Sequence, residues 1–264
     1  FRLPNKPNVS VNYGIINITD SEQELSAYHE GLYEIYDTLP GDEHYIGRYR
    51  IYNKTKENWF GTGTGYKVND YFSWGWSTFI TSYNKVHFLL QEGTVLRIAN
   101  SNNIVPIGGS KIDEQVILNA IGWINILGAN YKKNNWSLGF TVTLPRVNIN
   151  FIGKGSIRKS ISTNVSSIYP ENNFMTSSEQ TGLKTTYKSP WVFDFGVSKK
   201  LGSSTQIHAR IAYFSSIKKY DMLTSDDSQK NTFDFSVPQN SNFYTVQRSN
   251  KSIVNFAFGI EQNI

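Results

Sequence analysis

The chain has 264 residues, of which 14% are aromatic and only 39% hydrophobic, and its formal net charge is +5. A low hydrophobic content with many Tyr and Phe side chains argues against a large conventional core and favours β-strands that are apolar on one face only. The absence of cysteine excludes a disulfide framework or thiolate metal site, and the scattered basic residues argue against a nucleic-acid partner.

The first predicted strand spans residues 8–17, where apolar and polar residues alternate with a period of two. This period places successive side chains on opposite faces of a strand. The acidic stretch over residues 18–43 lacks it, so we expect a long loop there with a short helical turn within residues 21–36. No secretory signal precedes the first strand and the last strand ends abruptly, so we expect both ends to lie inside a longer protein.

Alternation is strongest from residue 44 to residue 83. The motif GTGTG at residues 61–65 has no Lys-Ser ending, so we interpret its glycines as one thin face of a strand rather than a phosphate loop. Asn69-Asp70 has the composition of a two-residue hairpin turn. In the strand that follows, one face presents Phe72, Trp74, Trp76 and Ile80.

In the middle of the chain, the apolar residues change from even to odd sequence positions at Pro145. We expect a long polar loop over residues 87–113, a strand over 114–131, a tight turn at 132–135 and a strand over 136–144. The apolar residues occupy even positions before Pro145 and odd positions after it, at Val147, Ile149 and Phe151. One extra residue, a β-bulge, produces such a switch.

Residues 191–217 contain a predicted hairpin. Its apolar face comprises Trp191, Phe193, Phe195, Val197, Ile207, Ala209, Ile211 and Tyr213. A three-residue loop at 202–204 pairs Leu201 with Thr205 and sets Gly196 opposite Arg210. Asp194 then becomes the diagonal neighbour of Arg210, and we predict a contact between these two side chains on the opposite face.

The connections fall into two length classes. Short ones lie at residues 69–70, 132–135 and 202–204, and long ones over 18–43, 87–113, 164–180 and 221–250. They alternate through about eight strands, the last over 252–260, as in outer-membrane barrels with brief periplasmic turns and long external loops. The sequence therefore predicts an all-β, antiparallel transmembrane β-barrel, one domain over residues 1–264, in contact with outer-membrane lipid and lipopolysaccharide. A soluble sandwich is the alternative.

Three segments resemble the OmpP/FadL-type transporters of hydrocarbons and fatty acids. They are TLPGDEHYIGRYRIYNKTKENWFGTGTGYKVNDYFSWG, NNWSLGFTVTLPRVNINFIGKG and YKSPWVFDFGVSKKLG. The resemblance implies a barrel of about fourteen strands in a Gram-negative outer membrane that takes up long-chain hydrophobic compounds by diffusion. The family's N-terminal hatch, with its Asn-Pro-Ala motif, does not occur in this sequence, so no gating residue carries over.

The candidate site residues are polar side chains assigned to the inner face and the external end. The inward set is Lys154, Arg158, Asp194, Ser198, His208 and Arg210, and Arg48 and Arg50 form a candidate first capture site. Two interpretations stay open: a wetted wall with mutually neutralising charges, or a site for a fatty-acid carboxylate. Pro145 is a candidate lateral exit for cargo, with a simple bend of the strand as the alternative.

No catalytic or metal-binding pattern occurs in the sequence. The four histidines lack metal-ligand spacing, and there is no Gly-x-Ser-x-Gly elbow. We therefore expect no enzymatic activity, no metal and no cofactor. The competing function is a structural one, in which the barrel serves as a docking subunit of a larger outer-membrane secretion or assembly complex.

Overall fold

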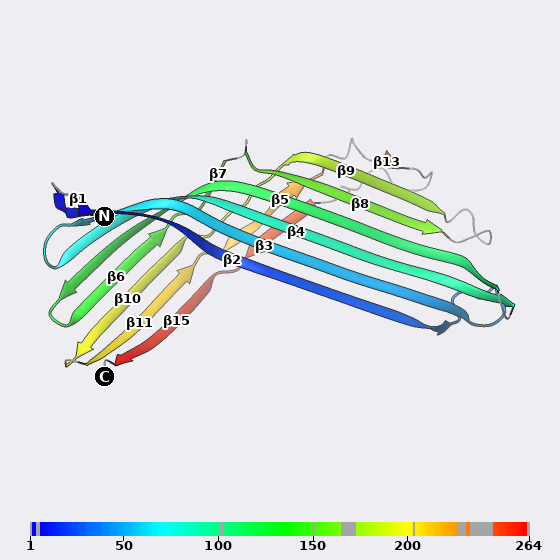
Figure 1. The fold of residues 1–264 in the computed structure, drawn as a ribbon, viewed down its shortest axis with the longest axis horizontal. Helices are drawn as coiled ribbons and strands as arrows, with labels where there is room; N and C mark the ends of the chain where they lie inside the picture. Colours follow the sequence, from blue (N-terminus) through cyan, green and yellow to red (C-terminus); the bar gives the residue numbers. More distant parts are fainter. Residues whose placement is uncertain are drawn as a thin grey trace.

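The structure, a computed structural model, describes residues 2–3, 6–100, 103–149, 152–164, 173–202, 204–225, 231–232 and 245–262. Over these residues the chain is all-β, and its antiparallel main sheet curls into a half-barrel at one end (Figure 1). The described part of the chain has no helix long and apolar enough to cross a membrane.

The strands differ greatly in length. The long ones are β2 (Lys6–Tyr33), β3 (Glu43–Lys67), β4 (Phe72–Asn100) and β5 (Asn103–Lys133). The shorter ones are β6 (Trp136–Thr143), β8 (Lys154–Asn164), β9 (Phe174–Lys184), β10 (Val192–Leu201), β11 (Thr205–Phe214), β12 (Ile217–Thr224), β14 (Thr245–Asn250) and β15 (Ile253–Gln262). The shortest are β1 (Arg2–Leu3), β7 (Val147–Asn148) and β13 (Asn231–Thr232).

The main sheet branches along β5. Its path runs β1-β2-β3-β4-β5-β6-β10-β11-β15, and β7 and β8 also pair with β5, beyond the end of β6. β9 pairs with β8, while β12 and β14 form a separate two-stranded sheet. The branching divides the molecule into two parts, which we call the wall and the sandwich.

The wall lies at the end of the short turns. It consists of residues 8–16 of β2, 60–67 of β3, 72–80 of β4 and 123–133 of β5, together with β6, β10, β11 and β15. The sandwich consists of the remaining lengths of β2 to β5 with β8, β9, β12 and β14. There the separate pair β12–β14 packs against one face of the main sheet, which we call the inner face.

The core of the sandwich forms where β12 covers the inner face. Leu118 of β5 and Ile157 of β8 are fully buried there against Met222 and Leu223 of β12. Gly155 permits this close approach, because a Cβ atom at that position would lie only 2.8 Å from Leu223 Cδ1. Among the described residues, the buried apolar cluster therefore lies in the sandwich.

Two predicted loops are largely strands in the structure. β2 extends to Tyr33, so the predicted loop over residues 18–43 is confirmed only over 34–42 and its helical turn is wrong. β4 and β5 occupy the described residues of the predicted loop over 87–113. In β2, acidic side chains pair with basic ones of β3, so charge complementarity stabilises a segment that lacks apolar alternation. The predicted loops 164–180 and 221–250 contain the start of β9, the end of β12 and all of β13 and β14, and their other residues lie largely outside the described chain.

The predicted turn positions and the register of the 191–217 hairpin are confirmed, but the turn at Asn69-Asp70 is one residue longer than predicted, because Lys67 pairs with Ser73 and the Val68 N–H donates to the Phe72 carbonyl (3.0 Å). The Asn69 side-chain oxygen accepts hydrogen bonds from the backbone of Tyr71 (2.9 Å) and Phe72 (2.8 Å). Asn134, with a φ of 52°, turns the chain from β5 into β6. Leu201 pairs with Thr205, which places Gly196 opposite Arg210 as the three-residue loop predicts.

The extra residue at Pro145 is also confirmed. Thr143 pairs with Ile126 and Val147 pairs with Trp123, so three residues of one strand lie opposite two of β5. The predicted continuation of the strand through Ile149 is wrong, because β7 ends at Asn148; Phe151 lies outside the described residues. Between Asn148 and the start of β8 the chain bulges again before it rejoins β5.

Candidate functional site

The outer face of the wall is an exposed apolar belt that crosses all eight strands. One of its rows joins Phe140, Phe195, Ile211 and Phe256 of adjacent strands. Further exposed belt residues are Tyr13, Ile15, Phe60, Tyr66, Phe72, Trp74, Trp76, Ile80, Trp123, Leu127, Tyr131, Trp136, Phe193, Tyr213, Val254, Phe258 and Ile260. Phe256 is 78% exposed. A continuous apolar surface of this extent indicates contact with lipid or with another protein.

Aromatic side chains gather at both borders of the belt. Near the short turns, the Tyr66 and Trp74 rings lie 6.3 Å apart. At the opposite border, the Phe193 ring lies 6.1 Å from that of Trp191 and 6.3 Å from that of Tyr213. Two aromatic girdles around an apolar band are typical of transmembrane β-barrels, because these rings suit the interface between lipid and water.

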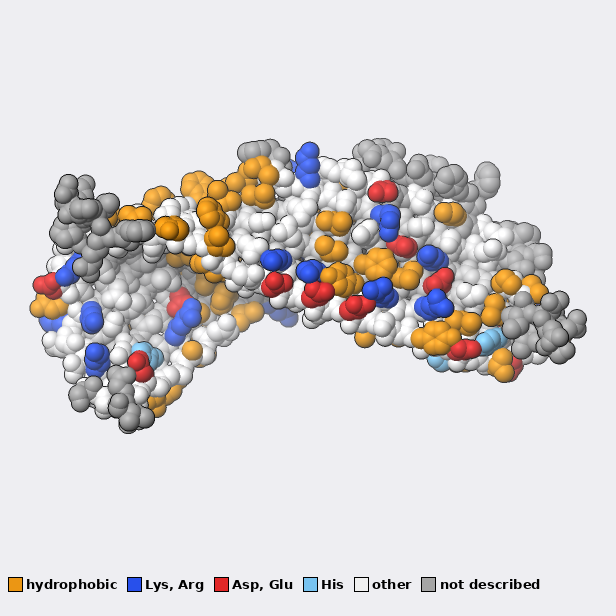
Figure 2. Space-filling model, viewed as in Figure 1, with side chains coloured by type: hydrophobic (Ala, Val, Ile, Leu, Met, Phe, Trp, Pro, Cys, Tyr) orange, Lys and Arg blue, Asp and Glu red, His pale blue; other side chains and the backbone are white. Residues whose placement is uncertain are grey.

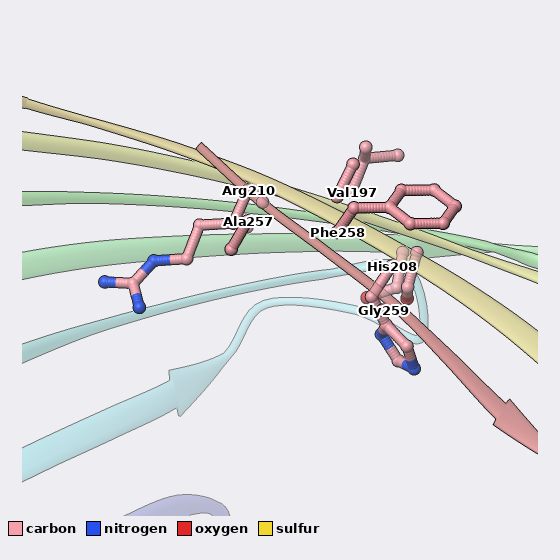
Figure 3. Close-up of a pocket in the computed structure, with 11 residues that line it drawn as sticks. Val197, His208, Arg210, Ala257, Phe258 and Gly259 are labelled. Atoms are coloured by element: carbon pink, nitrogen blue, oxygen red, sulfur yellow. The ribbon is translucent and has the colours of Figure 1, made fainter. Parts of the chain in front are cut away.

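The inner face of the wall carries small and polar side chains. Its residues include Gly61, Gly63, Gly65, Ser73, Gly75, Ser77, Gly139, Gly196 and Gly259. An open hollow of about 520 Å³ is lined by Ser137, Ser198, His208 and Arg210, among others. Figure 3 shows Arg210 and His208 pointing away from Val197 and Phe258, which belong to the apolar face.

The predicted contact between Asp194 and Arg210 is confirmed. The Arg210 Nε atom donates to both carboxylate oxygens of Asp194, each at 2.8 Å, and Nη2 also contacts Oδ2. On the same face, His208 Nε2 lies 3.5 Å from Glu261 Oε2. Because each basic side chain here has an acidic neighbour, the arrangement favours a wetted wall with neutralised charges over an open carboxylate site.

The other predicted site residues do not join this group. Arg48, Arg50 and Arg158 lie on the outer face of the sandwich, where Arg50 pairs with Glu24 (2.8 Å). Arg158 Nη2 lies 3.6 Å from Asp113 Oδ1. The prediction that Lys154 and Arg158 point inward is wrong, because the second bulge before β8 inserts an odd number of residues and reverses the parity again.

Ion pairs line the outer face of the sandwich, beyond the border of the apolar belt. Arg50–Glu24 and Lys54–Glu22 are both 2.8 Å apart, and Lys56–Asp20 is 3.6 Å apart. Figure 2 shows acidic and basic side chains next to one another along this part of the sheet. The same strand faces are apolar in the wall, so the outer surface changes from apolar to charged at one level of the sheet.

An aromatic and charged cluster fills the inner face where the wall meets the sandwich. The Tyr187 ring stacks on that of Tyr83 at 3.9 Å with an interplanar angle of 10°. Its hydroxyl donates to Glu57 Oε2 at 3.2 Å. The guanidinium carbons of Arg146 and Arg248 each lie 4.9 Å from the same ring centroid. Burial, and then the Glu57 carboxylate, raise the pKa of Tyr187, so its hydroxyl stays protonated.

Arg146 anchors this cluster to the main sheet. Its Nη2 donates to the carbonyl oxygens of Ala120 (2.6 Å) and Thr81 (3.3 Å), and the side chain is almost fully buried. Gly122 makes room for it, because a Cβ atom there would lie 2.1 Å from Arg146 Nε. Sequence patterns miss the cluster, since Arg146 and Tyr187 lie in irregular segments between strands; the parity switch at Pro145 is the only local signal beside it.

Neither a protein-family model nor a curated protein matches the sequence significantly. Among the described residues, no group of three or more His, Asp or Glu side chains is placed to hold a metal ion. A functional proposal therefore depends on the geometry of the wall and its two faces.

Proposed function

We propose that the wall is part of a transmembrane β-barrel in the outer membrane of a Gram-negative bacterium. The observation that carries the proposal is the apolar belt, which faces outward on all eight wall strands, while the inner face carries mostly small and polar side chains. β10, β11 and β15 have 10 residues each, close to the length of about 9–11 residues that a tilted strand needs to cross a bilayer. The ion pairs of the sandwich then lie in water beyond the membrane border.

Single-cysteine labelling tests this assignment, because the native chain has no cysteine. We would attach a fluorophore at Phe195→Cys on the belt or at Ser198→Cys on the inner face and reconstitute each variant in lipid vesicles. We expect brominated lipid to quench the label at position 195 and aqueous iodide to quench it at position 198. Equal quenching of both labels by iodide would identify a soluble sandwich instead.

We propose further that the barrel takes up hydrophobic small molecules, such as long-chain fatty acids, by diffusion and without enzymatic chemistry. The support is an interruption of the strand ladder beside Pro145. Among the described residues, side-chain contacts join 144–149 to 185–191: the Arg146 N–H donates to Ser189 Oγ (2.8 Å), and the Tyr187 N–H donates to Asn148 Oδ1 (3.1 Å). A wall held by so few hydrogen bonds is a suitable point for cargo to leave sideways.

Replacement of Pro145 tests this exit. Pro145→Val supplies a backbone donor and should strengthen pairing with the neighbouring strand, so we expect slower uptake of a fluorescent long-chain fatty acid into vesicles. Pro106→Val, in the sandwich portion of β5, is the matched control and should leave uptake unchanged. If both variants transport at the native rate, Pro145 only bends the strand and the exit lies elsewhere.

A docking subunit remains the second candidate, favoured by the open edges of the sheet. Among the described strands, β15 pairs only with β11, and β2 beyond Tyr13 pairs only with β3. Unpaired strand edges are not stable in lipid, so further strands must complete the wall. Purification from native membranes with a mild detergent distinguishes the candidates: a stoichiometric large partner favours docking, and a barrel with bound lipid favours transport.

A further inference from the structure

The sandwich contains a small, partly open pocket between the inner face of the main sheet and β14. Its lining is Asn53, Lys85, His87, Val116, Leu118 and Val246, and its volume is about 240 Å³. Two cross-strand rows form its floor: Asn53, His87 and Val116 in one, and Lys85 and Leu118 in the next. We propose that this pocket binds a small organic anion, a carboxylate that carries a short apolar chain.

The charge of the pocket comes from Lys85. Its ammonium group has no hydrogen-bond or ion-pair partner among the described residues, although the side chain is partly buried. Burial, and next the nearby guanidinium of Arg248, lower the pKa of Lys85, because both disfavour its charged form. A carboxylate beside this ammonium would remove the unfavourable interaction and form a charge-assisted hydrogen bond.

The acidic residues nearest to the pocket are already engaged. Glu114 is ion-paired with Lys159. Glu57 accepts hydrogen bonds from the Trp59 indole (2.8 Å) and from the Tyr187 hydroxyl (3.2 Å). Neither acid lines the pocket, so the described residues offer Lys85 no internal counter-ion. A bound anion would stabilise its charged form, which burial otherwise disfavours.

The remaining lining selects the chemical class of the anion. Val116, Leu118 and Val246 form an apolar surface opposite the polar groups, which suits a short hydrocarbon chain. His87 Nδ1 lies 2.7 Å from Asn53 Oδ1, so these two side chains hold each other and add a polar rim. A phosphate dianion would need more donors than one ammonium and this rim provide, whereas a monovalent carboxylate matches them. The volume is below the roughly 300 Å³ at which drug-sized sites begin, which limits the chain to a few carbons.

The pocket is separate from the wall, and its test does not depend on transport. The full chain would be reconstituted in lipid nanodiscs, and its thermal unfolding followed with hexanoate, with uncharged hexan-1-ol and with inorganic phosphate. We expect hexanoate to raise the unfolding temperature in a concentration-dependent way, and the other two probes to leave it unchanged. If the native protein does not take up fatty acid but is still stabilised by hexanoate, the transport proposal is refuted and the proposal for this pocket stands.

Two variants and a matched control locate the binding. Lys85→Met should weaken the hexanoate effect by about tenfold or more, the size expected for the loss of a charged hydrogen bond. Without ligand, this variant should be at least as stable as the native chain, because it removes an unpaired charge. Val246→Phe, which fills the pocket but keeps Lys85, should lose the effect too. Lys54→Met, on the outer face and paired with Glu22, should retain it.

Three results would contradict the proposal for this pocket. If hexanoate has no effect on the native chain, or if Lys85→Met responds as the native chain does, the pocket does not bind carboxylates through Lys85. If inorganic phosphate stabilises the protein as strongly as hexanoate, the site recognises charge alone and the proposed ligand class is wrong.

Discussion

The wall and the sandwich are built from the same strands with opposite polarity. In the wall, β3, β4 and β5 turn Phe60, Ile80 and Trp123 outward, exposed by 62%, 57% and 46%. In the sandwich, the same outer face carries the ion pairs among other side chains, and an apolar cluster points inward around Leu118. The register of β4 against β3 continues without a shift across the border, so each strand keeps the same face outward along its length. What changes across the border is the type of side chain on that face.

The proposed membrane location accounts for this difference, because the medium, rather than strand propensity, then determines which face is apolar. Where lipid surrounds the outer face, apolar side chains are at least as well solvated outside as inside. Where water surrounds it, apolar side chains gain free energy only when β12 and β14 cover them. Four substitution pairs test the comparison, each with one member in the wall and its counterpart in the sandwich or at the border.

The largest effect is expected from truncation of the sandwich core. Leu118→Ala removes a fully buried side chain, so we expect a loss of about 2–5 kcal/mol in the free energy of unfolding. Ile126→Ala, on the same face of β5 but within the wall, lacks a covering layer and should cost about 1 kcal/mol or less. Equal losses in urea titrations would show that the wall has a second layer of its own.

A charge on the outer face should distinguish the two parts next. Phe195→Arg places a guanidinium in the centre of the belt and should destabilise the vesicle-reconstituted protein by about 2–4 kcal/mol. Phe88→Arg, on the outer face of the sandwich beside Tyr52 and Gln115, should change stability by less than about 1 kcal/mol. Tolerance of both variants would place the belt outside the membrane.

The border itself can be tested through two glycines on the inner face of β5. Gly122→Ala brings a Cβ atom to 2.1 Å from Arg146 Nε and 2.8 Å from the Val147 carbonyl, so we expect a cost of about 1–3 kcal/mol. At Gly128 the nearest atom would be Thr141 Cγ2 at 3.5 Å, an ordinary contact, so Gly128→Ala should be neutral or slightly stabilising. Thermal unfolding measures both; an unaffected Gly122→Ala variant would mean that Arg146 does not anchor the border.

The smallest effect concerns the inner ion pair of the wall. A double-mutant cycle with Asp194→Asn and Arg210→Gln should give a coupling of about 1 kcal/mol or less, because the Arg210 side chain is 64% exposed. The same cycle on Glu24 and Arg50, on the outer face of the sandwich, should give a similar value, and both should weaken with added salt. A much stronger coupling for Asp194 and Arg210 would show that the inner side of the wall is dry.

The sequence by itself determined most of the wall. The hairpin of β10 and β11, its register and the contact of Asp194 with Arg210 follow from an alternation of period two and the length of one turn. The Asn69-Asp70 turn and the extra residue at Pro145 are likewise local features. Such features are visible in sequence because neighbouring residues alone fix which face each side chain takes.

Only the tertiary structure decided the sandwich. The part of β2 after residue 17 has no apolar alternation, and it forms a strand through its backbone pairing with β3, where its acids lie beside the basic side chains of that strand. The inward or outward direction of Arg158 depends on bulges whose length no local pattern reveals. The pocket joins Lys85 to Val246, which lie far apart in the chain and meet only when β14 covers the main sheet. Contacts of this kind arise from packing between distant segments, so they leave no periodic signal in the sequence that forms them.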